Sequence, residues 1–90
     1  MSIDLPPVRY DHPYPSVIVR HVSPSEIARL CGGPSPALAW VSEAGGCQDW
    51  EGSTCIIYIR SPLPPRYKGE RFVIRHETGH CNGWPADHPR

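Results

Sequence analysis

The sequence predicts a small α+β domain, in which a short mixed or antiparallel sheet of about three strands packs on two helices. Two segments, 16–22 and 54–60, are rich in the β-branched residues that are typical of strands. Two others, from Ser23 and from about Glu70, carry signals for the start or the end of a helix. With 90 residues, the chain can build one modest hydrophobic core.

The predicted strands are the segments 16–22, 37–42 and 54–60. In the last of these, TCIIYIR, one set of alternate residues forms an apolar face, whereas the other set includes Tyr58 and Arg60. This pattern predicts one core face and one partly exposed face, as on an edge strand. The residues that precede it, EAGGCQDWEGS, are rich in turn formers and predict a wide hairpin.

The first helix is predicted to begin in the sequence SPSE, residues 23–26. Ser23 can cap the helix, Pro24 suits its first position, and Glu26 completes a capping box. The Gly-Gly-Pro run at 32–34 should end the helix after about two turns, because glycine adopts left-handed conformations easily and proline cannot continue the helix.

The second helix is predicted over the sequence ERFVIRHETGHCN, residues 70–82. Gly83 suits the left-handed position at its end, Trp84 is placed for the hydrophobic contact of such an end, and Pro85 prevents continuation. Gly79 lies inside the helix, where glycine costs about 1 kcal/mol relative to alanine. We therefore expect another segment of the chain to approach the helix closely at this glycine.

Residues 1–16 contain four prolines among polar residues and are predicted to form an extended arm, whereas residues 17–90 form a single domain. The formal net charge is zero, with nine basic and nine acidic residues, so we expect no nucleic-acid partner. No stretch approaches the ~18 apolar residues of a membrane span, and we expect no membrane partner. The first residues lack the basic start and apolar stretch of a secretory signal, which predicts a cytoplasmic location.

Four cysteines are present, and no two of them form a CxxC pair that would predict a thiolate zinc site. The expected cytoplasmic location favours buried, reduced thiols. The alternative is one or two disulfides, with Cys47 and Cys55 bracketing a loop. Four cysteines allow three connectivities, and the sequence does not choose among them.

The pentapeptide HETGH, residues 76–80, places two histidines four positions apart in the second predicted helix. Residues with this spacing lie on one face, so His76 and His80 can bind one zinc ion at about 2.0–2.1 Å. Glu77 projects about 100° further round the helix and is unsuited to be a third ligand. It can instead serve as general base toward a water molecule, the role that glutamate has in the HExxH motif.

A catalytic zinc ion normally has three protein ligands and one open position. No glutamate follows Glu77 in the sequence, and Cys81 projects about 100° away from His80 on the helix. The remaining downstream donors are Asp87 and His88.

We predict His88 as the third ligand, because Gly83 lets the chain turn back toward the helix. Asp87 could then hydrogen-bond a ligand imidazole and fix its tautomer. Two alternatives remain open from the sequence: Asp87 and His88 exchange these roles, or the third ligand is an upstream histidine, His12 or His21.

The stretch HETGHCNGW resembles the active-site helix of the zincin metallopeptidases, and more narrowly of the metzincins, whose motif continues HExxH with x-x-G-x-x-H. Four residues match this longer motif position by position: His76, Glu77, His80 and Gly83. The third ligand position of the family holds Ala86, and His88 lies two residues later. The Met-turn of the family has no counterpart, because the only methionine is Met1. The whole segment 75–89 is similar to small HExxH proteins of bacterial and prophage origin.

The resemblance implies a minimal zincin-like domain and a zinc-dependent, metallopeptidase-like hydrolase, in which water activated by zinc and Glu77 attacks a peptide bond. It implies a peptide or protein substrate that pairs with an edge strand beside the zinc helix, and residues 54–60 are expected to be that strand. A protein partner could complete the cleft. The alternative is a non-catalytic zinc protein that belongs to a larger assembly such as a phage particle, with a location in the virion.

Overall fold

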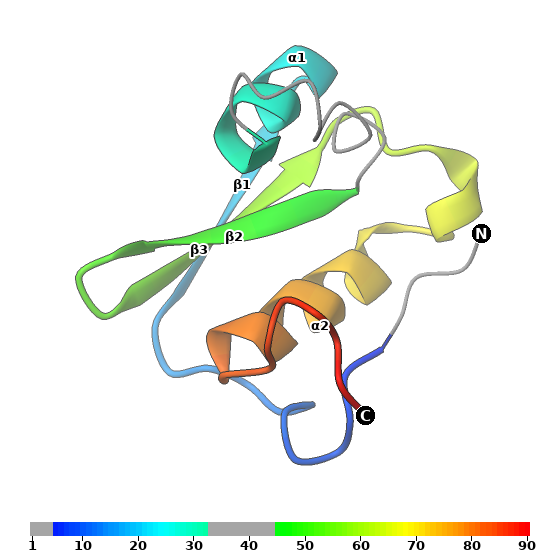
Figure 1. The fold of residues 1–90 in the computed structure, drawn as a ribbon. Helices are drawn as coiled ribbons and strands as arrows, with labels where there is room; N and C mark the ends of the chain where they lie inside the picture. The colour runs from blue at the N-terminus through cyan, green and yellow to red at the C-terminus, as the bar shows by residue number, and fades with distance from the viewer. Residues whose placement is uncertain (1–4, 33–44) are drawn as a thin grey trace.

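The computed structural model describes residues 5–32 and 45–90, and its three-stranded mixed sheet with two helices confirms the predicted α+β class (Figure 1). The elements, in chain order, are β1 (Val17–Val22), α1 (Pro24–Ile27) with a π-helical turn (Ala28–Gly32), β2 (Gly46–Glu51), β3 (Thr54–Arg60), a 3-10 turn (Pro65–Tyr67) and α2 (Glu70–Cys81). The predicted strand at 37–42 lies outside the described residues. No described helix has the length and apolar character that crossing a membrane requires.

The sheet has the order β1-β3-β2, so β3 is its central strand. β1 runs parallel to β3 and β2 runs antiparallel to it. The prediction that residues 54–60 form an edge strand is therefore wrong. The physical reason is that both backbone edges of the strand are hydrogen-bonded, one to β1 and the other to β2. Its two faces are also covered, since Ile57 is 0% exposed on one and Ile56 is 3% exposed on the other.

The strand β2 lies inside the segment for which the sequence predicts only a wide hairpin. A two-residue turn, Gly52 and Ser53, joins it to β3, and Gly52 has a φ of 63° that suits glycine. Because glycine is uncommon in strands, Gly46 makes β2 difficult to predict from the sequence. Packing nevertheless requires a glycine at this position. A Cβ at this position would lie 2.5 Å from the carbonyl oxygen of Tyr58 and 2.9 Å from Val73.

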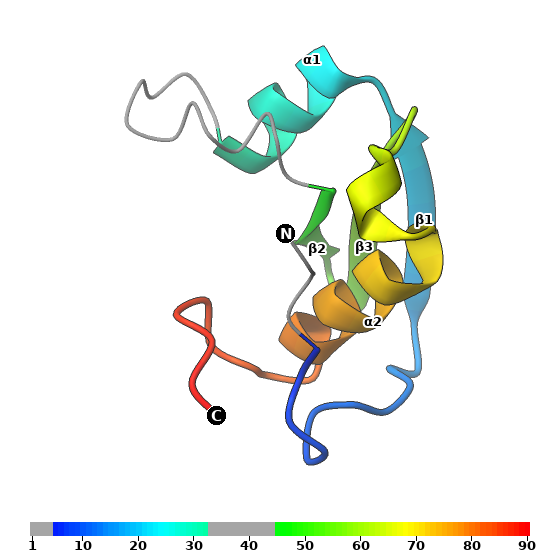
Figure 2. The same ribbon diagram turned by 90° about the vertical axis from the view of Figure 1, so that its right-hand side faces the viewer.

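The predicted capping box at the start of α1 is confirmed. The Ser23 hydroxyl accepts a hydrogen bond from the backbone N–H of Glu26, and the Glu26 carboxylate accepts one from the backbone N–H of Ser23. α1 contacts β3, whereas the longer α2 lies across one face of the sheet (Figure 2).

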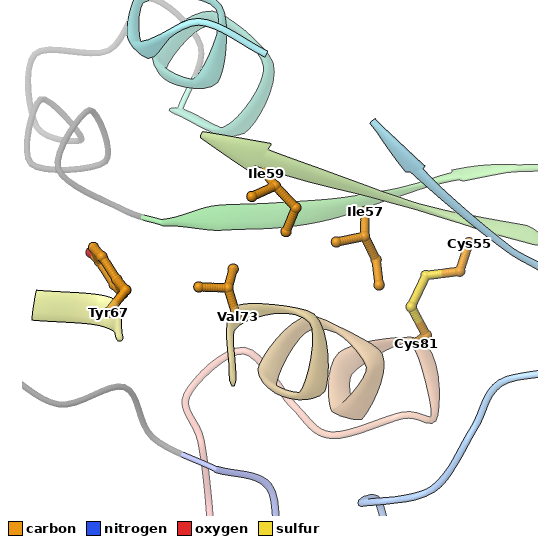
Figure 3. Close-up of a cluster of buried hydrophobic side chains, with 6 residues drawn as sticks. All are labelled: Cys55, Ile57, Ile59, Tyr67, Val73 and Cys81. Atoms are coloured by element: carbon orange, nitrogen blue, oxygen red, sulfur yellow. A yellow bond between two sulfur atoms is a disulfide. The ribbon is translucent and has the colours of Figure 1, made fainter. Parts of the chain in front are cut away.

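The hydrophobic core lies between α2 and the sheet (Figure 3). It consists of buried side chains from β3, α2 and the 3-10 turn: Cys55, Ile57, Ile59, Tyr67, Val73 and Cys81. α2 thereby has one face fixed against the central strand, and its other faces are available for function.

Two disulfides join the described cysteines, Cys31 to Cys47 and Cys55 to Cys81. The expectation of reduced thiols is wrong, and so is the pairing of Cys47 with Cys55. Cys47 and Cys55 cannot pair easily across the β2–β3 hairpin, because Cys47 lies opposite Tyr58 and Cys55 lies opposite Trp50. Each disulfide instead ties a helical segment to a strand, and the second one fixes α2 to β3.

We predict that proteolysis of the non-reduced protein releases linked peptides containing Cys31 with Cys47 and Cys55 with Cys81. Mass spectrometry identifies them directly. Replacing both Cys55 and Cys81 by alanine should lower the free energy of unfolding by about 2–4 kcal/mol in urea denaturation, since the closed loop is lost. A peptide linking Cys47 to Cys55 would contradict the structure.

Candidate metal centre

Three histidine side chains meet beside the C-terminal end of α2, and they are the three that the sequence predicts as ligands: His76, His80 and His88. Their Nε2 atoms form a triangle with sides of 3.1, 3.2 and 3.3 Å. A tetrahedral zinc ion with nitrogen ligands at about 2.0–2.1 Å separates those nitrogens by roughly 3.3–3.4 Å. The cluster could therefore hold a metal ion.

The cluster is half-buried, so its side chains are fixed by packing and still reach solvent. Within residues 5–32 and 45–90, no further His, Cys, Asp or Glu atom joins the group. The upstream candidates lie elsewhere: the His21 ring contacts the Glu70 carboxylate, and His12 Nδ1 lies 3.2 Å from the carbonyl oxygen of Pro13.

The end of α2 turns the chain back toward the histidines by a Schellman motif. The N–H of Gly83 donates to the carbonyl oxygen of His80 at 3.1 Å, and the N–H of Trp84 donates to that of Gly79 at 2.9 Å. Gly83 has a φ of 104°, which a residue with a side chain rarely adopts. The predicted helix end is confirmed at this glycine.

A second turn then brings His88 into the cluster. The N–H of His88 donates to the carbonyl oxygen of Pro85 at 2.9 Å, and His88 has a left-handed φ of 56°. These two turns in succession bring His88 to the two histidines of the helix. Asp87 is exposed and lies outside the cluster, so the geometry favours His88 over Asp87 as its third member.

The hydrogen bond of His80 determines which of its ring nitrogens is available. Its Nδ1 lies 2.7 Å from the carbonyl oxygen of Trp84, and a carbonyl oxygen only accepts hydrogen bonds. The neutral ring therefore carries its proton on Nδ1 and presents a lone pair at Nε2, as a metal ligand must. Burial lowers the pKa of His80, against the opposing effect of this hydrogen bond, and so favours the neutral ring.

A bound cation would satisfy the three converging ring nitrogens. The Nε2 lone pair of His80 faces the Nε2 atoms of His76 and His88 at 3.3 and 3.1 Å. One proton can bridge only one pair of these nitrogens, whereas a metal ion at the centre interacts with all three.

The Trp84 ring contacts all three histidine rings of the cluster. It is stacked on His80 at a centroid distance of 4.9 Å and meets His76 and His88 at 5.1 and 4.8 Å. The side chain is 2% exposed. The sequence predicts Trp84 as a core contact at the helix end, but gives no signal that its ring touches all three imidazoles.

Glu77, the residue after His76, is a buried carboxyl group with 6% of its surface exposed. Within the described part of the chain, no hydrogen bond or charged group contributes to the pKa of this carboxyl group. Desolvation by burial raises its pKa to about 8, because the charged form loses its hydration. A bound cation nearby would favour the charged carboxylate and lower this pKa again.

The N-terminal arm packs on α2 at the glycine that the sequence marks as anomalous. Pro6 is buried, and a Cβ on Gly79 would lie 2.7 Å from Pro6 Cβ and 3.1 Å from the Trp84 ring. The expectation that another segment approaches Gly79 closely is confirmed.

Two polar contacts hold the arm in register along the same helix. Arg75 donates hydrogen bonds to both carboxylate oxygens of Asp11. The side-chain amide of Asn82 donates to the carbonyl oxygens of Tyr10 and His12. Arg75, Gly79 and Asn82 are spaced four and three positions apart, so they lie on one stripe of the helix. The arm therefore covers a face of α2 adjacent to that of the histidines.

The chain matches no known protein family model, no curated protein and no solved structure.

We predict that replacing His88 by alanine weakens zinc binding at least about 100-fold, as loss of one of three ligands should. Asp87→Ala, a change at the neighbouring exposed residue, should leave the affinity within about twofold. Competition with a chromophoric chelator measures both dissociation constants. If Asp87→Ala gave the larger loss, the assignment of His88 to the cluster would be wrong.

Gly79→Ala should destabilise the protein by roughly 1–3 kcal/mol, although alanine is the better helix former, because the added Cβ overlaps Pro6. Urea denaturation measures the change. The matched control is the same substitution combined with Pro6→Gly, where most of the overlap is absent and the loss should shrink. Equal losses in both backgrounds would show that the arm does not pack at Gly79.

Proposed function

We propose that this protein is a zinc-dependent hydrolase that cleaves peptide bonds. The observation that carries the proposal is a triangle of three imidazole Nε2 atoms with sides close to those of a tetrahedral zinc site, together with a buried carboxyl group, Glu77, which directly follows the first of these histidines in the sequence. Three protein ligands are the number that catalytic zinc sites use, with a fourth position for water or substrate. The HExxH residues on α2 support the same chemistry.

Zinc is the metal that best suits this donor set. Imidazole nitrogen also binds copper, iron and nickel, but zinc accepts a tetrahedral arrangement without penalty. When bound, zinc polarises a carbonyl group and makes water a stronger acid, with a pKa of about 7.

Glu77 is the proposed general base. Its carboxylate would accept a proton from the attacking water and deliver it to the nitrogen of the leaving amine. A base is most effective when its pKa lies near the working pH. Burial raises the pKa of Glu77 to about 8 without metal, and a zinc ion held by the histidines would lower it again and favour the carboxylate that accepts the proton.

A peptide substrate would pair with an outer strand of the sheet, since β3 has neighbours on both sides. The tail that carries His88 lies on the side of α2 away from β1 (Figure 2). Among the described strands, β2 is the outer strand on that side, and α2 packs against it. We therefore assign the substrate-pairing role to β2 in place of residues 54–60.

A structural zinc site is the second candidate, and the position of His88 favours it. This residue lies in a tail whose neighbours Asp87 and Pro89 are exposed. A zinc ion joining His88 to α2 would fix that tail, as a component of a larger assembly and without any reaction.

Glu77→Gln distinguishes the two candidates. In a hydrolase, this variant should bind zinc and fold normally but lose at least about 100-fold in turnover, because the general base is gone. A quenched fluorescent peptide library measures turnover, and chelator competition measures zinc. Glu70→Gln is the matched control, since Glu70 lies on the same helix and is exposed. Its turnover should be unchanged.

Removal of zinc by a chelator should abolish turnover, and added zinc should restore it. Turnover that persists in Glu77→Gln or without metal would rule out the proposed mechanism. A structural site predicts no turnover at all, together with unfolding of His80→Ala, since the metal would then stabilise the folded chain.

A further inference from the structure

We propose that Trp84 is a positioning residue, which holds the third ligand, His88, in place before a metal ion binds. The inference rests on the zinc-binding part of the proposed function and not on catalysis. It concerns the indole N–H and the ring of Trp84, which the HExxH motif does not include.

The indole ties the tail to the helix end. Its Nε1–H donates a hydrogen bond of 2.9 Å to the carbonyl oxygen of Pro89, the residue after His88. Trp84 is itself held in place. Its backbone N–H donates to the carbonyl oxygen of Gly79, and its side chain is 2% exposed. The rigid indole of Trp84 thus holds Pro89, the residue that directly follows the third ligand, His88.

The tail needs such an anchor. Ala86, Asp87 and Pro89 are exposed, so little apolar packing holds them. His88 is bound locally by the turn to Pro85, and its left-handed backbone is unfavourable for a residue with a Cβ. The indole hydrogen bond and the ring contact of 4.8 Å between Trp84 and His88 oppose the loss of this conformation.

The ring also limits the directions in which the imidazoles can move. It is stacked on His80 with an interplanar angle of 14° and lies nearly edge-on to His88, with an angle of 65°. Both rings therefore rest against one surface with their Nε2 atoms 3.1 Å apart. A ligand set held in this way binds metal more tightly, because less conformational entropy is lost on binding.

The test is the zinc affinity of Trp84→Phe, which keeps an aromatic ring and removes the indole N–H. The dissociation constant, measured by chelator competition, should rise about 10–100-fold, the usual effect of losing a group that orients a ligand. The matched control is Trp50→Phe, because Trp50 lies on β2 with 44% of its surface exposed. This control should bind zinc with unchanged affinity.

A double-mutant cycle separates positioning of His88 from a general effect on the fold. In a His88→Ala background, Trp84→Phe should change the zinc dissociation constant by no more than about twofold, because the ligand that Trp84 positions is absent. An equal loss in both backgrounds, or no loss in the single variant, would overturn the proposal.

If Trp84→Phe does not fold, the unsubstituted protein provides the test. The indole N–H of Trp84 should exchange with solvent more slowly than that of Trp50, and zinc should slow it further, since a bound His88 holds Pro89 in place. An indole N–H whose exchange does not respond to zinc would overturn the proposal.

The outcomes separate this inference from the proposed hydrolase. Zinc binding without any turnover would contradict the proposed hydrolase activity. The role of Trp84 would still be decided by the zinc dissociation constants of the Trp84→Phe variants. A chain that binds no zinc would remove both.

Discussion

The attachment of α2 to the central strand is the constraint on which the candidate site depends. Cys81, the residue that follows His80, is joined by a disulfide to Cys55 on β3, and Val73 packs on the same strand further along the helix. Since both ends of α2 are held against the core, the face that carries His76 and His80 has one orientation. A chain of 90 residues has little apolar surface to achieve this by packing alone, and the covalent link compensates.

Three faces of α2 contribute to the site in different ways. One face is buried and contains Glu77, the next carries the histidines, and the one beyond is covered by the N-terminal arm through Pro6 and Asp11. The arm is therefore part of the folded unit around the helix. Its contact at Gly79 also limits where Trp84 can lie, so the arm, the helix end and the tail form one packed arrangement behind the imidazoles.

Local signals in the sequence were sufficient for the helix ends and for the three histidines, because each depends on a short motif: the capping box at Ser23, the glycine end at Gly83 and the spacing of HETGH. The position of β3 was not predictable in the same way. The sequence of its neighbour β2 contains residues that are typical of turns and so does not resemble a strand. Gly46 in β2 is required by close packing, which is visible only in the folded structure. The disulfide pairing and the contacts of Trp84 are likewise set by tertiary geometry, since the cysteines of each pair lie 16 and 26 positions apart.

The most direct test of the account is anomalous diffraction at the zinc absorption edge, on crystals of protein purified without chelators or nickel columns. We predict one zinc ion within about 2.0–2.1 Å of the Nε2 atoms of His76, His80 and His88, with water in the fourth position. A protein side chain in that fourth position would make the site structural. A folded protein whose three histidines adopt the same triangle with no metal would contradict the central claim.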